Sequence, residues 1–278
     1  MGNIRSIIAA LALVVSGTAG AAAADLGLPP PPPMEPAPAP TCCGGPWYLK
    51  GFMGMATPNV GSIFTDDFRT NTFTVEHEDI KSSPFFGMGI GYDTGHYLRF
   101  DLTGEYRGKS AFFAQDKYPG GDGTFHTGQP VFNPGTNEYT ADIESWVGLA
   151  NAYIDLGTWH CVTPYIGGGV GFANVSVLGL KDVNVPNNGV AFGSNGTDTN
   201  FAWAVYAGLA YDVTPAVTLD LSYRYTDLGD VKSGPVTTYQ GDFAYNGLEI
   251  NHITSNDLML GVRWKFGGSP APMPVSYK

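Results

Sequence analysis

The stretch from Leu98 to Arg107 alternates strictly between two kinds of side chain. One face carries Leu, Phe, Leu, Gly and Tyr, and the other carries Arg, Asp, Thr, Glu and Arg. The same period of two recurs over Val217–Thr226 and over Asp257–Phe266. Because successive side chains of a strand point to opposite faces of its sheet, this period predicts β-strands with one apolar and one polar face.

Weaker alternation adds further segments and brings the number of predicted strands to eight. The eight predicted strands are Trp47–Ala56, Pro84–Tyr92, Leu98–Arg107, Tyr139–Leu156, Pro164–Val175, Phe201–Val213, Val217–Thr226 and Asp257–Phe266. Within Tyr139–Leu156 the phase changes, because Asp142 and Glu144 share one face while Asn151 and Asp155 share the other. We expect a β-bulge inside this strand.

The predicted connections alternate in length along the chain. Short ones lie at Asp93–His96, Gly157–Thr163 and Thr214–Ala216, and long ones at Thr57–Ser83, Gly108–Glu138, Ser176–Asn200 and Asp227–Ile253. Short turns at one end and long loops at the other are typical of an antiparallel barrel in the bacterial outer membrane. The first and last strands are expected to pair, since an unpaired strand edge finds no hydrogen-bond partner in hydrocarbon.

Composition supports β-structure. Glycine accounts for 38 of 278 residues, and each glycine inside a helix costs about 1 kcal/mol relative to alanine. The formal net charge of -11 argues against a nucleic-acid partner, because phosphates require a basic surface. We therefore expect an all-β chain that binds no nucleic acid.

The first residues are typical of a secretory signal peptide, with Arg5 before an apolar run and small residues up to Ala24. Leu28–Pro40 is rich in proline and predicts an extended linker, an interpretation that ranks ahead of a ligand for a proline-binding module. The predicted organisation is a signal peptide at 1–24, a periplasmic linker at 25–46, a barrel at 47–266 and a tail at 267–278.

Alternation alone does not tell which face points into a barrel. Side chains just fill an eight-stranded barrel, so large aromatic residues fit better on the outside, facing lipid. This set comprises Phe100, Tyr106, Trp203, Tyr211, Tyr223, Tyr225, Trp264 and Phe266. Aromatic residues also gather at strand ends, which predicts two girdles at the bilayer interfaces. The girdle at the short turns contains Trp47, Tyr92, Tyr97, Trp159, Tyr165, Tyr211 and Phe266, and the outer one contains Tyr106, Trp146, Phe201 and Tyr225.

With the aromatic face in lipid, the charged face points into the barrel. The inward set comprises Lys50, Arg99, Asp101, Glu105, Arg107, Asp220, Arg224, Asp257, Arg263 and Lys265. In the final antiparallel hairpin we expect one ion pair between Asp220 and Arg263 and another between Arg224 and Asp257. Because buried charges are costly unless paired, this network is expected to plug the lumen. The alternative is an ion path lined by the same residues.

Four segments carry a resemblance to a known family, namely Leu219–Asp230, Trp47–Gly51, Thr163–Gly171 and Leu260–Phe266. They resemble the opacity-type, OmpA-like outer-membrane β-barrels (porin family) of alphaproteobacteria. The resemblance implies an eight-stranded barrel with surface loops, and a role in envelope integrity or in contact with host and other surfaces. It also implies that the barrel-assembly machinery recognises the last strand through Gly261, Trp264 and Phe266.

The sequence departs from this family in two ways. Residues 267–278 follow Phe266, so the closing aromatic residue is not the last residue of the chain. The peptidoglycan-binding domain of the larger OmpA proteins is not found, so the resemblance does not imply anchoring to the cell wall.

The cysteines are all expected on the periplasmic side, because Cys42 and Cys43 precede the first strand and Cys161 lies in a short turn. A disulfide between Cys161 and one of the other two stands as an even alternative to free thiols.

The histidines are scattered over loops and turns, with no spacing that predicts a metal site. They are His77, His96, His126, His160 and His252. His77 and His252 flank the closing seam near Ser62 and Ser255, but this spacing does not require a catalytic triad. We expect no enzyme, no metal and no cofactor.

Three functions fit the sequence. The leading hypothesis is a structural and surface-interaction protein in the outer membrane, surrounded by lipid and lipopolysaccharide, whose outer loops contact surface or host ligands. The second is a narrow porin-like diffusion channel for small solutes. The third is a soluble periplasmic barrel that binds a ligand.

Overall fold

A computed structural model describes residues 45–65, 74–117, 135–186, 188–241 and 244–266. The expected signal peptide, nearly all of the expected linker and the expected tail lie outside the described residues, as do Cys42, Cys43 and His126. Among the described residues, none forms a helix of the length and apolar character that crossing a membrane requires.

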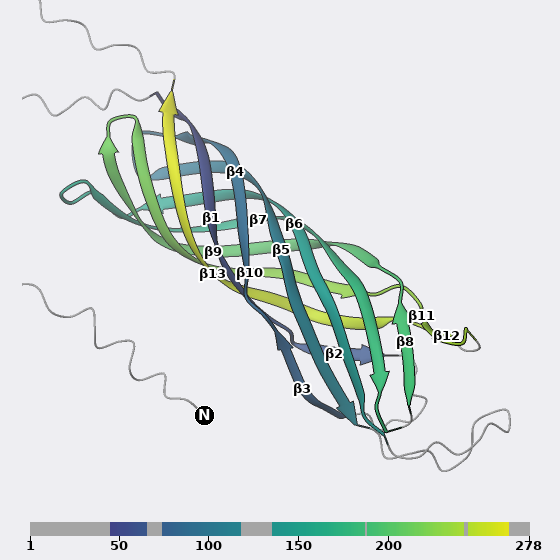
Figure 1. Ribbon diagram of the computed structural model, residues 1–278. Coiled ribbons are helices and arrows are strands. Elements are labelled where there is room, and N and C mark those ends of the chain that lie inside the picture. Colours follow the sequence, from purple (N-terminus) through teal and green to yellow (C-terminus); the bar gives the residue numbers. More distant parts are fainter. Residues whose placement is uncertain (1–44, 66–73, 118–134, 187, 242–243, 267–278) are drawn as a thin grey trace, which may run out of the picture. The chain divides into compact units, whose positions relative to one another are not determined.

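Eight long antiparallel strands form a closed ring (Figure 1). In chain order they are β1 (Trp47–Asn59), β4 (Ser83–Asp93), β5 (Leu98–Lys117), β6 (Asn137–Asp155), β7 (Val162–Asn184), β9 (Gly196–Thr214), β10 (Val217–Lys232) and β13 (Leu248–Phe266). Each strand pairs with the next one around the ring, and β13 returns to β1, with Trp47 opposite Phe266. The predicted eight-stranded barrel and its closure between the first and last strands are confirmed.

Tight turns join the strands at one end of the barrel, as the sequence predicts. Between β4 and β5, the Asp93 side chain accepts a hydrogen bond of 2.9 Å from the N–H of Gly95, whose φ is 77°. Between β9 and β10, Thr214 Oγ1 accepts hydrogen bonds from two backbone N–H groups. Side chains that cap their own turn in this way allow a short connection.

The other end differs from the prediction of long loops, because much of each predicted loop is strand. β5 continues to Lys117, β6 begins at Asn137 and β7 runs to Asn184. Short strands extend the wall further: β2 (Ser62–Thr65) on β13, β3 (Thr74–Ile80) on β5, β8 (Gly189–Gly193) on β7, β11 (Val236–Thr238) on β8 and β12 (Ala244–Tyr245) on β11. We call this part of the barrel, built by the short strands and the adjoining ends of the long strands, the outer extension.

The sense of the alternation reverses between the two parts of the barrel. On the outward face of β7, Ile166 and Val170 are exposed apolar residues, whereas Asn174 and Ser176 follow on the same face. The inward face of the outer extension is apolar and buried, with Ile63, Ile80, Phe112, Ile143, Val175, Val177, Leu228, Val231, Ile250 and Ile253. The outer extension is therefore packed like a soluble barrel, while the membrane part carries its apolar face outside.

This reversal also explains why the bulge predicted inside β6 is wrong. The strand alternates without a break, with Asn151 buried inside and Asp142 on the outer face. Polar residues fall on both phases because the lumen is polar in one half and the outer surface is polar in the other. The irregularities lie on the neighbouring strands: β5 has an extra residue between Arg107 and Ser110, and β7 has one near Gly179, whose φ of 61° suits glycine.

The large aromatic residues predicted to face lipid do so. At the turn end, the rings of Trp47 and Tyr92 meet edge to face at 5.2 Å. At the outer limit of the apolar belt, the ring of Tyr106 lies 5.8 Å from that of Phe86 and 4.9 Å from that of Trp146. These contacts form part of two aromatic girdles at the heights where a bilayer has its interfaces.

Tyr165 is an exception among the predicted girdle residues, because it is buried inside the barrel. Its ring packs edge to face on Tyr153 at 5.6 Å, and the guanidinium of Arg99 lies 4.8 Å from its centre. The phase of β7 places Tyr165 on the same face as Ala173 and Val175, so proximity to a turn was a poor guide to its direction.

Candidate functional site

The charged residues predicted to face inward all lie on the inner face of the ring. All of them except Lys265 are buried, namely Lys50, Arg99, Asp101, Glu105, Arg107, Asp220, Arg224, Asp257 and Arg263. Lys265 is partly exposed near the turn end.

Four of these residues form one hydrogen-bonded group, which we call the transverse cluster: Glu105 and Arg107 on β5, Arg224 on β10 and Asp257 on β13. Arg224 donates hydrogen bonds of 2.7 and 2.8 Å to the two Glu105 oxygens and one of 2.8 Å to Asp257. Arg107 donates to Glu105 at 2.9 Å and to Asp257 at 2.6 and 3.2 Å. Each guanidinium thus contacts both carboxylates, and the formal charges cancel.

The transverse cluster joins opposite walls of the barrel. β5 and β10 are separated by three strands in either direction around the ring. The structure brings the predicted hairpin partners Arg224 and Asp257 together, and it adds Glu105 from the far wall. The contact of Glu105 with Arg224 depends on the relative depth of two distant strands in the closed ring. The register of a single hairpin does not determine this depth.

A second layer of charges lies nearer the turn end. Arg263 Nε donates to Asp220 at 2.6 Å, so the other predicted hairpin pair is also in contact. Lys50 lies 3.5 Å from Asp101, which also accepts hydrogen bonds from Asn151 at 2.7 Å and from Tyr48 at 3.2 Å. These hydrogen bonds occupy the lone pairs of a carboxylate that is otherwise costly to bury.

Two partners at the turn end were missed at the sequence level. Asp155 pairs with Arg99 at 2.8 Å, and Asp93 pairs with Lys265 at 2.8 Å. The predicted inward set contained two more cations than carboxylates, and this surplus was the signal that carboxylates were still to be found.

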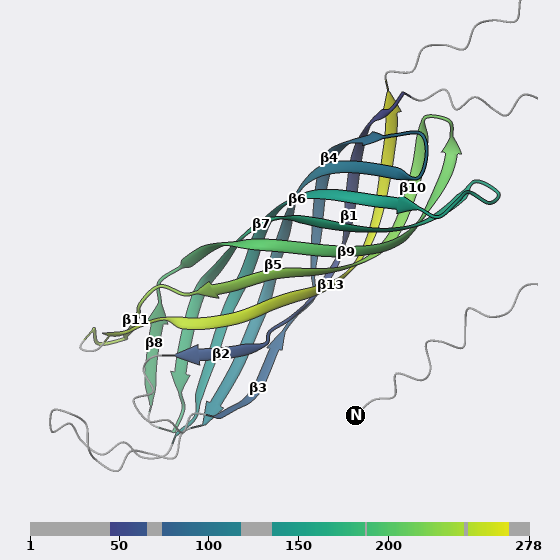
Figure 2. The ribbon, with the colours of Figure 1, turned by 180° about the vertical axis from the view of Figure 1, so that it is seen from behind.

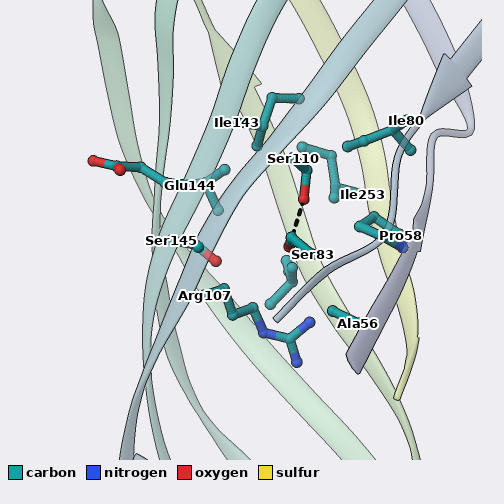
Figure 3. A pocket seen from close by; sticks show the side chains of 13 residues that line it. Ala56, Pro58, Ile80, Ser83, Arg107, Ser110, Ile143, Glu144, Ser145 and Ile253 are labelled. Carbon is teal, nitrogen blue, oxygen red and sulfur yellow. Dashed lines mark hydrogen bonds between the residues drawn. The ribbon is translucent and has the colours of Figure 1, made fainter. Parts of the chain in front are cut away.

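A small cavity of about 20 Å³ lies where the transverse cluster meets the apolar interior of the outer extension. Figure 3 shows the hydroxyl groups of Ser110 and Ser83, joined by a hydrogen bond of 2.7 Å, between Arg107 and Ile143. A space of this size holds about one water molecule. At this depth the interior is filled by side chains.

Asp116 is a buried carboxylate in the outer extension. It accepts hydrogen bonds from the backbone N–H of Asn137 at 2.9 Å, from Asn137 Nδ2 at 3.2 Å and from the Tyr139 hydroxyl at 2.9 Å. Among the described residues no cation pairs with it. Burial raises the pKa of Asp116 above the ordinary carboxyl value, although these hydrogen bonds act in the opposite direction.

The residues considered for catalysis lie on β2, β3 and β13. Ser255 is buried and donates its hydroxyl hydrogen to Asp257 at 2.5 Å, while the backbone N–H of His252 donates to Asp230 at 2.6 Å. Ser62 lies on β2 and His77 on β3. Within the described part of the chain, no group of three or more His, Cys, Asp or Glu side chains is arranged to hold a metal ion.

Cys161 is exposed in the turn between β6 and β7. It adopts a positive φ of 66°, next to His160 at 50°. The disulfide considered at the sequence level involves Cys42 or Cys43, which lie outside the described residues.

The surface of the outer extension is acidic and carries a few exposed aromatic residues. Its described acidic residues include Glu76, Glu78, Asp79, Glu138, Asp142, Glu144, Asp198, Asp227, Asp230 and Glu249, and its described lysines are Lys81, Lys109, Lys117, Lys181 and Lys232. Near the tip, Tyr239 is 77% exposed, and its ring lies 6.5 Å from that of Phe192. Exposed aromatic side chains of this kind are enriched at recognition surfaces.

Comparison with known proteins finds several relatives of this chain. The chain is 31% identical to outer membrane protein PagN of Salmonella typhimurium over 228 residues, which cover 79% of this chain and 89% of PagN. It is 28% identical to the Rickettsia conorii protein named "Putative adhesin RC1281" over 224 residues, 78% of this chain and 81% of that protein.

An uncharacterized Brucella suis protein is 31% identical over 190 residues, 64% of this chain. The chain spans 66% of that relative's length.

Among solved structures, the outer membrane protein OprG of Pseudomonas aeruginosa superimposes with a TM-score of 0.50 at 14% identity, covering 81% of this chain and 97% of OprG. This likeness concerns the fold. Residues 8–266 match the family described as outer membrane protein beta-barrel domain. With the closed ring, its lipid-facing belt and this match over most of its length, the chain belongs to the outer membrane protein beta-barrel family and resides in the outer membrane.

Proposed function

We propose that this protein is a non-enzymatic surface-interaction protein, in which the membrane part of the barrel is a closed anchor and the outer extension presents contact residues to host or other surfaces. The observation that carries this proposal is the continuation of the barrel wall beyond the lipid-facing belt. β7 has 23 residues, whereas a tilted strand needs about 9–11 to cross a bilayer. The surplus length is packed around its own apolar core.

The closed lumen supports an anchor more than a channel. The transverse cluster spans the lumen with matched charges, and the apolar interior of the outer extension lies directly above it. Ions would have to pass a neutral cluster of side chains and then an apolar core, both of which oppose the entry of charge. A narrow diffusion channel remains the second candidate, on the observation that charged residues line the lumen.

One relative supports contact with surfaces by its name alone, since it is named a putative adhesin. The exposed pair of Phe192 and Tyr239 offers candidate contact residues at the tip. We further propose lipopolysaccharide as the lipid neighbour of the outer girdle.

We also propose that the barrel-assembly machinery recognises β13. Trp264 and Phe266 point outward on this strand, where a partner reaches them before the barrel closes, and Gly261 lies between them and the outer part of the strand.

An adhesion assay tests the main proposal. Non-adherent bacteria that express the full chain are expected to bind host cells more than bacteria with an empty vector, and Phe192→Ser with Tyr239→Ser should reduce the gain. A matched control replaces the lipid-facing aromatic residues Phe100 and Tyr223 with leucine, which leaves the tip unchanged. Equal binding by vector and full-chain bacteria, with the folded barrel present in the membrane, would contradict an adhesive role.

A further inference from the structure

The wall of the outer extension has two free strand edges beside each other. In the part of the chain that the structure describes, β3 pairs with β5 alone and β2 pairs with β13 alone. β1, which precedes β2, and β4, which follows β3, are paired with each other up to Ala56 and Ser83. Figures 1 and 2 show β2 and β3 running at an angle to each other beyond this point.

The β3 edge is open to solvent on both of its faces. Ile80 is buried against the interior, and Glu78 lies on the same face of the strand, opposite the buried residue Ala114. Glu78 is nevertheless exposed, as are His77 and Asp79 on the outward face. The interior side of β3 is therefore reached by water from the seam between β2 and β3.

The edge is also strongly acidic. Glu76, Glu78 and Asp79 lie within one seven-residue strand. Glu76 is 3.8 Å from Lys117, an exposed pair, and no ion pair of Glu78 or Asp79 is found among the described residues. The unpaired backbone groups of an edge strand can accept another strand, and acidic side chains on both faces favour a strand that carries cations on both of its faces.

We propose that β3 is a docking edge for an extended, lysine- or arginine-rich segment of a partner protein, which adds to the barrel wall as a further strand. This deepens the proposed surface-interaction function by naming the surface and the class of partner. Backbone hydrogen bonds to the β3 edge supply affinity that does not depend on the partner's side chains. Glu78 and Asp79 select for positive charge, and the surplus of acidic residues on the outer extension attracts such a segment from a distance.

The test uses the full-length protein in lipid nanodiscs and a fluorescent synthetic peptide in which pairs of lysines alternate with pairs of valines, so that both faces of the added strand carry cations. We expect saturable binding, and an isotope-edited infrared spectrum in which the ¹³C-labelled peptide takes on a strand signature. Glu78→Gln with Asp79→Asn is expected to weaken binding about tenfold, the effect of losing two exposed ion pairs together with their long-range attraction.

Two controls separate a docking edge from simple charge attraction. Glu138→Gln with Asp142→Asn removes the same charge from the outer face of β6, which is paired on both sides, and should leave binding within about twofold. A peptide with the same side chains but methylated backbone nitrogens should bind at least about tenfold more weakly, since it cannot donate to the edge. Equal binding of the methylated peptide, or equal loss in both double variants, would overturn the proposal.

The adhesion assay and the peptide assay fail independently. Peptide binding without adhesion would leave the docking edge in place and remove the adhesive role. Adhesion without strand addition by the peptide would leave the adhesive role in place and remove the docking edge.

Discussion

Arg224 on β10 donates two hydrogen bonds to Glu105 on β5, a strand on the opposite wall of the barrel. Both side chains are at least 98% buried, and each contacts one further member of the transverse cluster, Arg224 with Asp257 and Glu105 with Arg107. The charge of each member is therefore compensated by neighbours from more than one strand. Removing one member leaves an uncompensated charge in a place that water does not readily reach.

We predict that Glu105→Gln lowers the free energy of unfolding by about 3–5 kcal/mol, because two guanidinium groups then face a single carboxylate. The measurement is urea unfolding of the barrel in lipid vesicles, followed by tryptophan fluorescence. Asp142→Asn is the matched control, since its pair with Lys109 is 3.7 Å long and exposed, and should cost no more than about 1 kcal/mol. Similar losses for the two variants would show that the transverse cluster is not a special element of stability.

We predict that the wild-type barrel shows no discrete conductance steps in planar bilayers, because the transverse cluster fills the lumen. Glu105→Ala with Arg224→Ala removes two opposite charges and much of their volume, but the apolar interior of the outer extension still closes the path, so this lumen variant should show no steps either. Lys109→Ala with Asp142→Ala, on the outer surface, should change nothing. Discrete steps of the wild-type barrel that change in the lumen variant would favour the diffusion channel instead.

The reversal of alternation along β7 gives a prediction about where the bilayer ends. Val170→Arg places a charge on the lipid-facing surface and is expected to cost about 2–4 kcal/mol of unfolding free energy. Ser176→Arg lies on the same face of the same strand, beyond the apolar belt, and should cost less than about 1 kcal/mol. The check is the unfolding free energy of each variant in vesicles. A large cost at Ser176 would place the lipid boundary further out than the girdle of Tyr106 and Trp146.

Asp116 makes the stability of the outer extension depend on pH. Its pKa is raised by burial, so between the ordinary carboxyl pKa and this raised value the folded state holds a proton that the unfolded state has lost. Stability should therefore fall as pH rises through that window and level off above it. Asp116→Asn should remove this dependence.

Hydrogen exchange at the outer end of β5, corrected for the intrinsic rate at each pH, measures the effect of Asp116. The control is Asp142→Asn on the outer face of β6, which should keep the wild-type pH dependence. Stability of the outer extension that rises with pH through the same window would contradict a raised pKa of Asp116 in the folded state.

Much of the membrane part could be predicted from the sequence, because one period and one sense of amphipathicity hold there. Leu98–Arg107 and Asp257–Phe266 were found as strands, and the inward direction of Arg224 and Asp257 followed from their phase. The outer extension could not be predicted in the same way. Residues such as Phe112 and Val175 are apolar and point inward, whereas the apolar residues of the membrane part point outward. A pattern with one constant apolar face therefore ends where the strand leaves the bilayer, and the outer part of the strand is not recognised.

The contacts across the lumen needed the closed ring. The register of one hairpin predicts the contact between Asp220 and Arg263. The contact between Glu105 and Arg224, which are 119 residues apart in sequence, also requires the relative depth of their two strands in the barrel. Depth is set by the shear of the barrel, which accumulates over every pairing around the ring. No single pair of segments contains that information.

The continuous path of β7 from the tight turn before Val162 into the outer extension also has a mechanical consequence. A pull on the outer end of the molecule acts along the strands, whereas the hydrogen bonds of an antiparallel pair lie across them. Sliding one strand past the next must break many of these bonds together, while peeling a loop would break them one at a time. A barrel loaded in shear yields only at high force, so a pull on the outer extension is resisted by the whole ring of strands together.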